Sequence, residues 1–224
     1  MENIPKYVIN LKRREDRLKK FYDTIPFPKD NIQVVYGFDG KNYENENEEE
    51  KNIYNKLPNQ LNPGEKGCFI SHIRIYKDII KKNIPYSIIF EDDAILCDDF
   101  KNKLQIVIDE MPTDTQILYF GGRFSPDFRM EQHTCRNITQ NIVAHNNVNW
   151  NHRDQGNHDR GTYGYIISNT LAKQFIQYFE NNVELYLAVD HWMIKYCMNN
   201  QIPIYNSYPL LCYSDACSPD SDIR

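Results

Sequence analysis

Residues 86–93 have the sequence Tyr-Ser-Ile-Ile-Phe-Glu-Asp-Asp, in which an apolar run passes directly into three acidic residues. A short and almost wholly apolar run is typical of a strand that is buried on both faces, so the sequence predicts a strand over residues 87–90. Pro85 stands before this strand, and the acidic residues end it. Strands of this kind belong to sheets that helices cover on both sides.

The segments on either side of this strand continue the pattern. Further strands are predicted over residues 6–11, 32–36, 117–120, 163–167 and 202–205. Helices are predicted over residues 13–22, 65–82, 98–111, 170–179 and 190–198. Strands that alternate with helices indicate an α/β fold with a mainly parallel central sheet. We expect strands 7–11, 87–90 and 117–120 to be neighbours in that sheet.

The size and charge of the chain limit what it can be. Its 224 residues, 41% of them hydrophobic, suit one core, so we expect a single domain over residues 1–224. A net charge of -5 argues against a nucleic-acid partner or an anionic membrane surface. No apolar run approaches the roughly 18 residues of a membrane span, and the first residues lack the pattern of a signal peptide. We therefore expect a cytoplasmic chain with no membrane span.

Two polar segments are expected on the surface. Residues 44–50 form an acidic run whose self-repulsion predicts a solvated loop or an exposed helix start. Residues 124–161 are rich in Asn and His and have little periodicity, which predicts a long irregular segment. Much of residues 136–159 is expected on the surface, near the place where a second substrate would bind.

The acidic residues Glu91, Asp92 and Asp93 are the first candidate site. In an α/β sheet, ligands bind outside the carboxyl ends of the strands. Three adjacent carboxylates repel one another, and a hard divalent cation such as Mg²⁺ or Mn²⁺, which prefers oxygen ligands, would neutralise them while bridging a diphosphate. An acidic turn or helix cap is the other interpretation.

Several segments in the same order resemble glycosyltransferase family 25. They are residues 7–17 (Tyr-Val-Ile-Asn-Leu-Lys-Arg-Arg-Glu-Asp-Arg), 63–72 (Pro-Gly-Glu-Lys-Gly-Cys-Phe-Ile-Ser-His), 88–93, 161–165 (Gly-Thr-Tyr-Gly-Tyr), 189–192 (Val-Asp-His-Trp) and 221–223 (Ser-Asp-Ile). This family includes bacterial lipooligosaccharide galactosyltransferases and the galactosyltransferase domain of procollagen-modifying enzymes. The resemblance implies a GT-A fold, a UDP-sugar donor, a divalent metal and transfer with inversion at the anomeric carbon.

The resemblance also implies a role for each acid. Asp93 is expected to bind Mn²⁺ or Mg²⁺ directly. Glu91 is expected to hold the ribose or a metal-bound water, with direct ligation of the metal as the alternative, and Asp92 is expected to take part in donor binding. Asp215 is a possible third ligand from its position. The metal would withdraw charge from the departing UDP.

Other residues fall on the family's donor-binding blocks. Arg13, Arg14 and Arg17 lie where the family contacts the nucleotide, and the planar fork of a guanidinium group suits a diphosphate. A solvated charge on a helix is the alternative for these arginines, above all for Arg17. Ser71 and His72 are expected to orient the donor, with a place in the core as the alternative for His72.

Asp190 is the candidate catalytic base. An inverting transfer needs a group that accepts the proton of the acceptor hydroxyl, and an ionised Asp serves this purpose. Contact with the donor sugar is one alternative, and a helix cap is another.

These observations predict a metal-dependent inverting glycosyltransferase. It would move galactose or glucose from a UDP-hexose to a hydroxyl of a glycan or of a glycosylated or hydroxylated protein. A non-catalytic module that binds a sugar nucleotide or glycan with the same fold is the alternative, and the intact acids Glu91 and Asp190 argue against it. A phosphoryl-transfer enzyme or nuclease is disfavoured by the net acidity and by the lack of a Gly-x-x-x-x-Gly-Lys-Ser/Thr loop.

Overall fold

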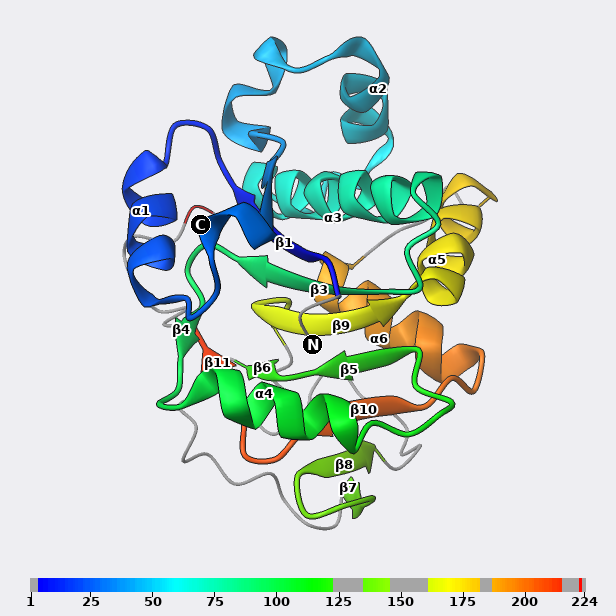
Figure 1. Ribbon diagram of the computed structural model, residues 1–224. Coiled ribbons are helices and arrows are strands. Elements are labelled where there is room, and N and C mark those ends of the chain that lie inside the picture. The colour runs from blue at the N-terminus through cyan, green and yellow to red at the C-terminus, as the bar shows by residue number, and fades with distance from the viewer. Residues whose placement is uncertain (1–3, 123–134, 146–160, 182–186, 215–221, 223–224) are drawn as a thin grey trace.

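The computed structural model describes residues 4–122, 135–145, 161–181, 187–214 and 222 of the chain. In these residues an eight-stranded sheet has the order β2-β1-β3-β9-β5-β10-β8-β7, and a small sheet has the order β4-β11-β6 (Figure 1). The strands of the large sheet are β1 (Lys6–Asn10), β2 (Ile32–Tyr36), β3 (Tyr86–Glu91), β5 (Ile117–Tyr119), β7 (Cys135–Asn137), β8 (Ile142–His145), β9 (Gly164–Ser168) and β10 (Ile204–Ser207). Those of the small sheet are β4 (Ile95–Leu96), β6 (Gly121–Gly122) and β11 (Cys212–Tyr213).

Helices connect most of these strands. The α-helices are α1 (Glu15–Thr24), α2 (Glu48–Lys56), α3 (Pro63–Lys81), α4 (Phe100–Asp109), α5 (Asn169–Asn181) and α6 (Val189–Asn199), and the short 3₁₀ helices are η1 (Lys29–Asn31) and η2 (Gly40–Asn45). Every strand of the large sheet except β8 and β9 runs in one direction. The predicted α/β fold with a mainly parallel sheet, the arrangement expected of a GT-A fold, is confirmed.

One prediction about strand order is wrong. The strand over residues 117–120 is not the neighbour of β3, because β9 lies between β3 and β5 and pairs with both in antiparallel register. All residues of β9 are buried. A strand that is apolar on both faces gains most when it lies inside a sheet, and its own sequence does not show which strands will flank it.

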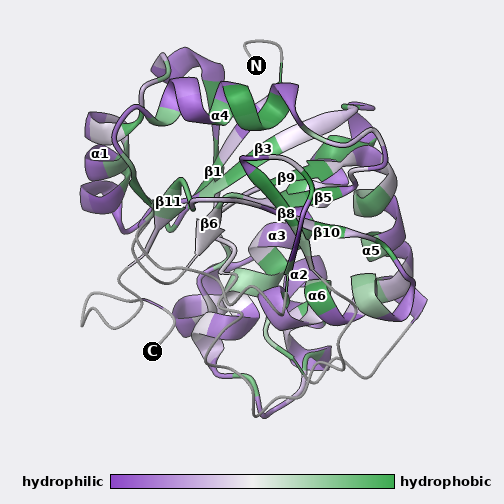
Figure 2. Ribbon diagram, turned by 90° about the horizontal axis from the view of Figure 1, so that it is seen from below, coloured by the Kyte–Doolittle hydropathy of each residue, from purple (hydrophilic) through white to green (hydrophobic). Residues whose placement is uncertain are grey.

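Alternate residues of the central strands enter two separate cores. On one face Tyr7, Ile89 and Tyr165 pack with α3, α5 and α6, whereas on the other face Val8 and Ile88 pack with α1 and α4. Figure 2 shows the apolar strands inside and hydrophilic residues along the outer helices. This three-layer arrangement leaves the carboxyl ends of β1 and β3 at one edge of the sheet.

The start of α3 is fixed against the loop that follows β2. Asn62 and Glu65 form a reciprocal capping box, with Pro63 in the first turn. One turn later, a Cβ atom on Gly67 would lie 2.6 Å from the carbonyl oxygen of Phe38 and 3.0 Å from the amide nitrogen of Gly40. Only glycine permits this close approach, which holds the loop against the helix.

The acidic run over residues 44–50 lies mostly on the surface, as predicted, and α2 begins inside it with Asn47 as its cap. Two of its members are more than solvated charges, because Glu46 and Glu50 both bind the guanidinium group of Arg74 on α3. These ion pairs attach the acidic segment to the helix.

The structure adds regular elements to the polar region that begins at residue 124. Strands β7 and β8 pair as an antiparallel hairpin within a segment that was predicted to be irregular. The rest of that segment falls largely outside the described residues. No helix in the described ranges is long and apolar enough to cross a membrane.

Candidate active site

A cleft opens at the carboxyl ends of β1 and β3, where a ligand site was predicted. Its free space is about 610 Å³, part of it open to solvent. Acidic residues, arginines, the loop after β2 and the first turns of α3 form its walls. The lining residues are Ile9, Leu11, Arg13, Arg17, Phe38, Asp39, Gly40, Lys41, Gly64, Cys68, Ser71, Glu91, Asp92, Asp93 and Asp222.

Asp92 is held by protein groups on both carboxylate oxygens. Asn10 donates a hydrogen bond of 2.6 Å to Oδ2, and Arg17 Nη2 lies 2.6 Å from Oδ1. Burial raises the pKa of Asp92 to about 7, with the charges of Asp93 and Glu91 adding to the rise and Arg17 and Asn10 opposing it. Asp92 therefore joins the ends of β1 and β3 to α1.

Asp93 is the acid most open to the cleft. Its side chain is 30% exposed, and its Oδ2 accepts a hydrogen bond of 3.0 Å from Ser214. Its Oδ1 is buried, and no group in the described part of the chain donates a hydrogen bond to it. Burial, together with the charge of Glu91, raises the pKa of Asp93 to about 6, against the opposing effect of Arg17. An oxygen with an unused lone pair at this position suits a divalent cation.

Glu91 points to the other side of the same strand end. Thr162, just before β9, donates a hydrogen bond to Glu91 Oε1, and His72 Nε2 lies 3.6 Å from the same oxygen. The side chain of Glu91 is 12% exposed. The antiparallel direction of β9 explains this contact, because it brings the start of β9 to the edge where β3 ends.

Ser71 and His72 of α3, which were expected to orient the sugar-nucleotide donor, both form hydrogen bonds with other groups of the protein. His72 is fully buried behind Glu91, and its Nδ1 lies 2.7 Å from the hydroxyl of Tyr165. Ser71 lines the cleft, but its hydroxyl accepts from the Phe38 amide at 2.9 Å and donates to the Gly67 carbonyl at 2.7 Å. Ser71 thus fixes the loop that forms one wall of the cleft.

The three predicted arginines converge on one carboxylate. Asp222 lies 2.8 Å from Arg13, 2.6 Å from Arg14 and 3.1 Å from Arg17. Arg13 and Arg17 line the cleft, whereas Arg14 is not among the lining residues. Arg13 also binds Asp39 at 2.8 Å and keeps 38% of its side chain exposed, whereas Arg17 is buried and is not a solvated charge.

Asp190 lies in the first turn of α6, near the cleft but not among its lining residues. The amide of His191 donates a hydrogen bond of 2.8 Å to Asp190 Oδ1. Burial and the charge of Glu91 raise the pKa of Asp190, with His191 opposing the rise. Cys68 stands close to both acids, since the charges of Glu91 and Asp190 add to the effect of burial in raising the pKa of its thiol.

Four residues that bind the predicted site residues were not themselves predicted from the sequence. Asn10, Asp39, Thr162 and Asp222 each bind a predicted site residue. Asn10, Thr162 and Asp222 stand in the blocks 7–17, 161–165 and 221–223, and that position was the available signal. Asp215, suggested as a third metal ligand, lies outside the described residues.

In open α/β sheets ligands bind outside the carboxyl ends of the strands, and the cleft of this protein lies there. The chain belongs to glycosyltransferase family 25, because the family model described as "Glycosyltransferase family 25 (LPS biosynthesis protein)" matches residues 3–193.

Two groups of relatives are similar to this chain in sequence. Human "Procollagen galactosyltransferase 2" is 27% identical over 93% of this chain and 31% of its own length. "Lacto-N-neotetraose biosynthesis glycosyltransferase LgtE" of Neisseria meningitidis is 30% identical over 68% of this chain and 53% of its own length. "Lipooligosaccharide biosynthesis protein lex-1" of Haemophilus influenzae is 28% identical over 69% of this chain and 50% of its own length. The chain spans about a third of the procollagen relative and about half of the bacterial ones.

Proposed function

We propose that this chain is a hexosyltransferase that moves galactose or glucose from a UDP-sugar to a hydroxyl acceptor, with inversion and with the help of a divalent metal. Membership of family 25 and the names of the relatives support transfer of a hexose. The observation that carries the proposal is the cleft itself, which is lined by Asp93, one of whose oxygens has no partner among the described residues, and by Arg13 and Arg17.

The acids of the cleft fit Mn²⁺ or Mg²⁺. Asp93 would hold the ion through Oδ1, and Glu91 would hold it directly or through a water, because both offer the oxygen ligands that hard cations prefer. Such an ion, when bound, would withdraw charge from the departing UDP. Asp92, already bound to Asn10 and Arg17, would keep the strand end in place.

The arginines are proposed to bind the diphosphate of the donor. Arg13 combines partial exposure with a place in the cleft wall, and Arg17 supplies positive charge deeper in the same wall. A diphosphate and the carboxylate of Asp222 are alternative partners for these guanidinium groups. We therefore expect donor binding to compete with the contacts of Asp222.

Asp190 is proposed to act as the base. The acceptor oxygen would attack the anomeric carbon while the bond from that carbon to UDP breaks, and the hydroxyl proton would pass to the Asp190 carboxylate. The hydrogen bond from the His191 amide orients this carboxylate, and its raised pKa makes it a better proton acceptor.

The acceptor is proposed to be a glycan or a glycosylated or hydroxylated protein, since the names of the relatives divide between these two classes. A cytoplasmic location stays a prediction of the sequence.

A transfer assay tests the proposed function. The protein would be incubated with UDP-galactose or UDP-glucose, with Mn²⁺ or with a chelator, and with a panel of glycans and hydroxylated peptides as acceptors. We expect Mn²⁺-dependent release of UDP and a product whose anomeric configuration, measured by nuclear magnetic resonance, is opposite to that of the donor. Donor binding without release of UDP or transfer under any condition would favour the non-catalytic module.

A further inference from the structure

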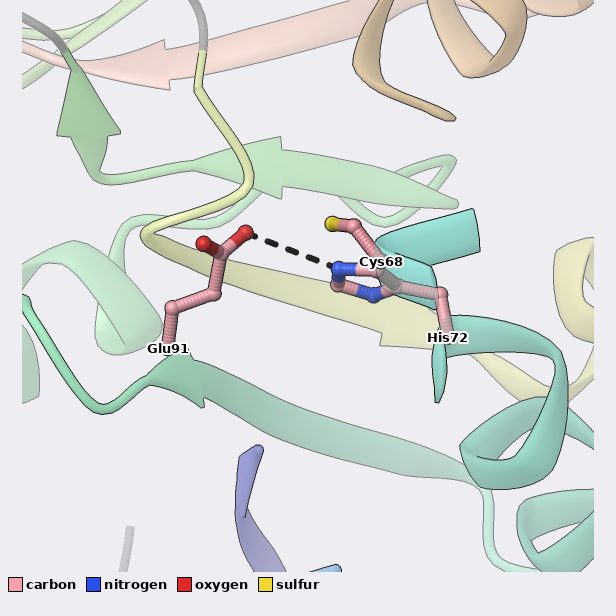
Figure 3. Close-up of side chains that lie close together, drawn as sticks. All are labelled: Cys68, His72 and Glu91. Carbon is pink, nitrogen blue, oxygen red and sulfur yellow. Dashed lines mark ion pairs between the residues drawn. The ribbon is translucent and has the colours of Figure 1, made fainter. Parts of the chain in front are cut away.

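Three side chains of different chemistry meet at the back of the cleft. Cys68 and His72 are one helical turn apart on α3 and so share a face of the helix, and Glu91 ends β3. One ligand atom from each lies within 4.8 Å of the other two. Figure 3 shows the three side chains pointing toward one another, with the sulfur atom on the side of Glu91.

A chain of buried hydroxyl groups determines which nitrogen of His72 carries a proton. Tyr76 donates to the sulfur of Met193 at 3.2 Å, because a thioether only accepts. The hydroxyl of Tyr76 must then accept from Tyr165, 2.9 Å away. With its proton used in this way, Tyr165 accepts from His72 Nδ1 at 2.7 Å. The chain therefore places a proton on Nδ1.

This assignment leaves His72 Nε2 facing an acceptor. In the neutral ring Nε2 has a lone pair, and Glu91 Oε1 lies 3.6 Å from it. No hydrogen-bond partner of Nε2 occurs in the ranges that the structure describes, although His72 is fully buried. Two lone pairs that face each other in a buried place need a positive charge between them, which is either a cation or a second proton on the ring.

We propose that Cys68, His72 and Glu91 bind Zn²⁺ at the back of the cleft, in a site separate from the Asp93 oxygen that suits Mn²⁺. Thiolate and imidazole ligands favour Zn²⁺ over Mn²⁺ and Mg²⁺. Tetrahedral zinc with bonds of about 2.0–2.2 Å to nitrogen and oxygen places these atoms roughly 3.4 Å apart, close to the separation found here. On binding, the sulfur–zinc bond replaces the S–H bond, and the proton leaves to solvent.

The surroundings complete such a site. Tyr165 accepts the Nδ1 proton of His72 and so fixes the ring in the orientation and tautomer in which Nε2 can bind zinc. Cys68 and Glu91 both line the cleft, so the fourth position of the zinc would face the cavity and take water. Because Glu91 also belongs to the proposed Mn²⁺ set, we expect Zn²⁺ to inhibit transfer; this consequence rests on the proposed function, whereas zinc binding does not.

The experiment uses Co²⁺ as a spectroscopic substitute for Zn²⁺, with no sugar nucleotide present. Thiolate bound to Co²⁺ gives a charge-transfer absorption in the near ultraviolet, and Zn²⁺ should remove it by displacing Co²⁺. We expect this absorption, saturating at one equivalent, in the wild type and in Cys97→Ser, a control in which a half-buried cysteine outside the cleft is replaced. Cys68→Ser should lack it and bind Zn²⁺ at least about tenfold more weakly.

A second variant tests the hydrogen bond that orients the His72 ring. Tyr165→Phe keeps the ring but removes the acceptor of the Nδ1 proton, so the Zn²⁺ affinity should fall by about 10–100-fold while circular dichroism shows a folded protein. Absence of the charge-transfer absorption in the folded wild type, or its persistence in Cys68→Ser, would overturn the proposal.

Discussion

Arg17 Nη2 lies 2.6 Å from Asp92 Oδ1, and both side chains are at least 90% buried. This pair joins α1 to the end of β3 at the floor of the cleft, and Asp93 shares the same guanidinium nitrogen at 3.0 Å. Neighbouring carboxylates in a place of low solvent access repel one another, so the cleft depends on Arg17 for its charge balance.

The first prediction concerns the removal of that balance. Arg17→Met should lower the free energy of unfolding by roughly 3–5 kcal/mol, because it leaves buried carboxylates without their cation. Urea denaturation measures this effect. Lys19→Met on the same helix removes a cation from the exposed pair with Asp23 and should change the midpoint little. Equal effects of the two variants would contradict the importance of the buried pair.

The second prediction tests Asp93 as the metal ligand. Asp93→Ala should abolish Mn²⁺-dependent UDP binding in calorimetry, because it removes the oxygen with no partner among the described residues. Glu91→Ala should weaken that binding less if Glu91 acts through a water. Asp98→Ala, on an exposed side chain just beyond the cleft, is the matched control and should bind UDP normally. If Asp93→Ala binds UDP with unchanged Mn²⁺-dependent affinity, Asp93 is not a metal ligand and the three acids are only an acidic turn.

The third prediction separates chemistry from binding at Asp190. Asp190→Asn retains the size of the side chain but cannot accept the hydroxyl proton, so turnover should fall by roughly 10²–10⁴ while donor affinity changes little. Affinities for UDP and for the UDP-sugar, measured beside turnover, give the answer. Weaker binding of the UDP-sugar alone would instead assign Asp190 to the donor hexose. Near-normal turnover would exclude the base role.

The fourth prediction concerns pH and Asp78. Burial acts to raise the pKa of this carboxylate, but hydrogen bonds from Lys82, Tyr7 and Gln33 outweigh it and lower the pKa. The unfolded chain therefore takes up the proton first, so the stability that Asp78 contributes is complete above about pH 3.9 and is lost as pH falls through the lowered native pKa.

Asp78→Asn should accordingly be less stable than the wild type at pH 7, and the difference should shrink as the pH falls below about 4. Urea midpoints measured across this range give the comparison. Asp98→Asn, with an exposed side chain, should show a small difference at every pH. A gap for Asp78→Asn that stays constant down to about pH 3 would contradict the pKa assignment.

The fifth prediction tests the close contact at Gly67. Alanine stabilises a helix interior by about 1 kcal/mol relative to glycine, so propensity alone predicts a gain for Gly67→Ala. We expect a net loss of about 1–3 kcal/mol, because the added Cβ would meet the backbone of Phe38 and Gly40. Thermal denaturation measures the sign. Lys81→Ala, at the exposed end of the same helix, should be nearly neutral.

The elements that the sequence predicted best have strong local patterns. Strand β2 has the predicted limits, and α5 extends the predicted helix by only a few residues, because periodic apolar residues determine both. The position of β9 between β3 and β5 was not predicted, since pairing between strands depends on contacts distant in sequence. The two-residue strands of the small sheet are too short to leave a pattern.

The candidate site shows the same division. The location of Glu91, Asp92 and Asp93 at a strand end followed from the chain itself, because an apolar run passes directly into charge. The burial of Arg17 did not, since a charged residue on an amphipathic helix has the same local pattern whether it meets solvent or a carboxylate from another strand. Thr162 and Asp222 bind partners that are distant in sequence, so the residues next to them in the chain give no chemical reason to choose them.

The antiparallel strand β9 and the Arg14–Asp222 contact both affect the order in which the molecule folds. Thr162 and Glu91, which its direction brings together, are 71 residues apart, and Arg14 and Asp222 are 208 residues apart. Contacts of such long range form slowly, because much of the chain must be confined before they can be made. The contacts that complete the cleft are therefore of long range, and we expect them to form late in folding, when segments from both ends of the chain have come together.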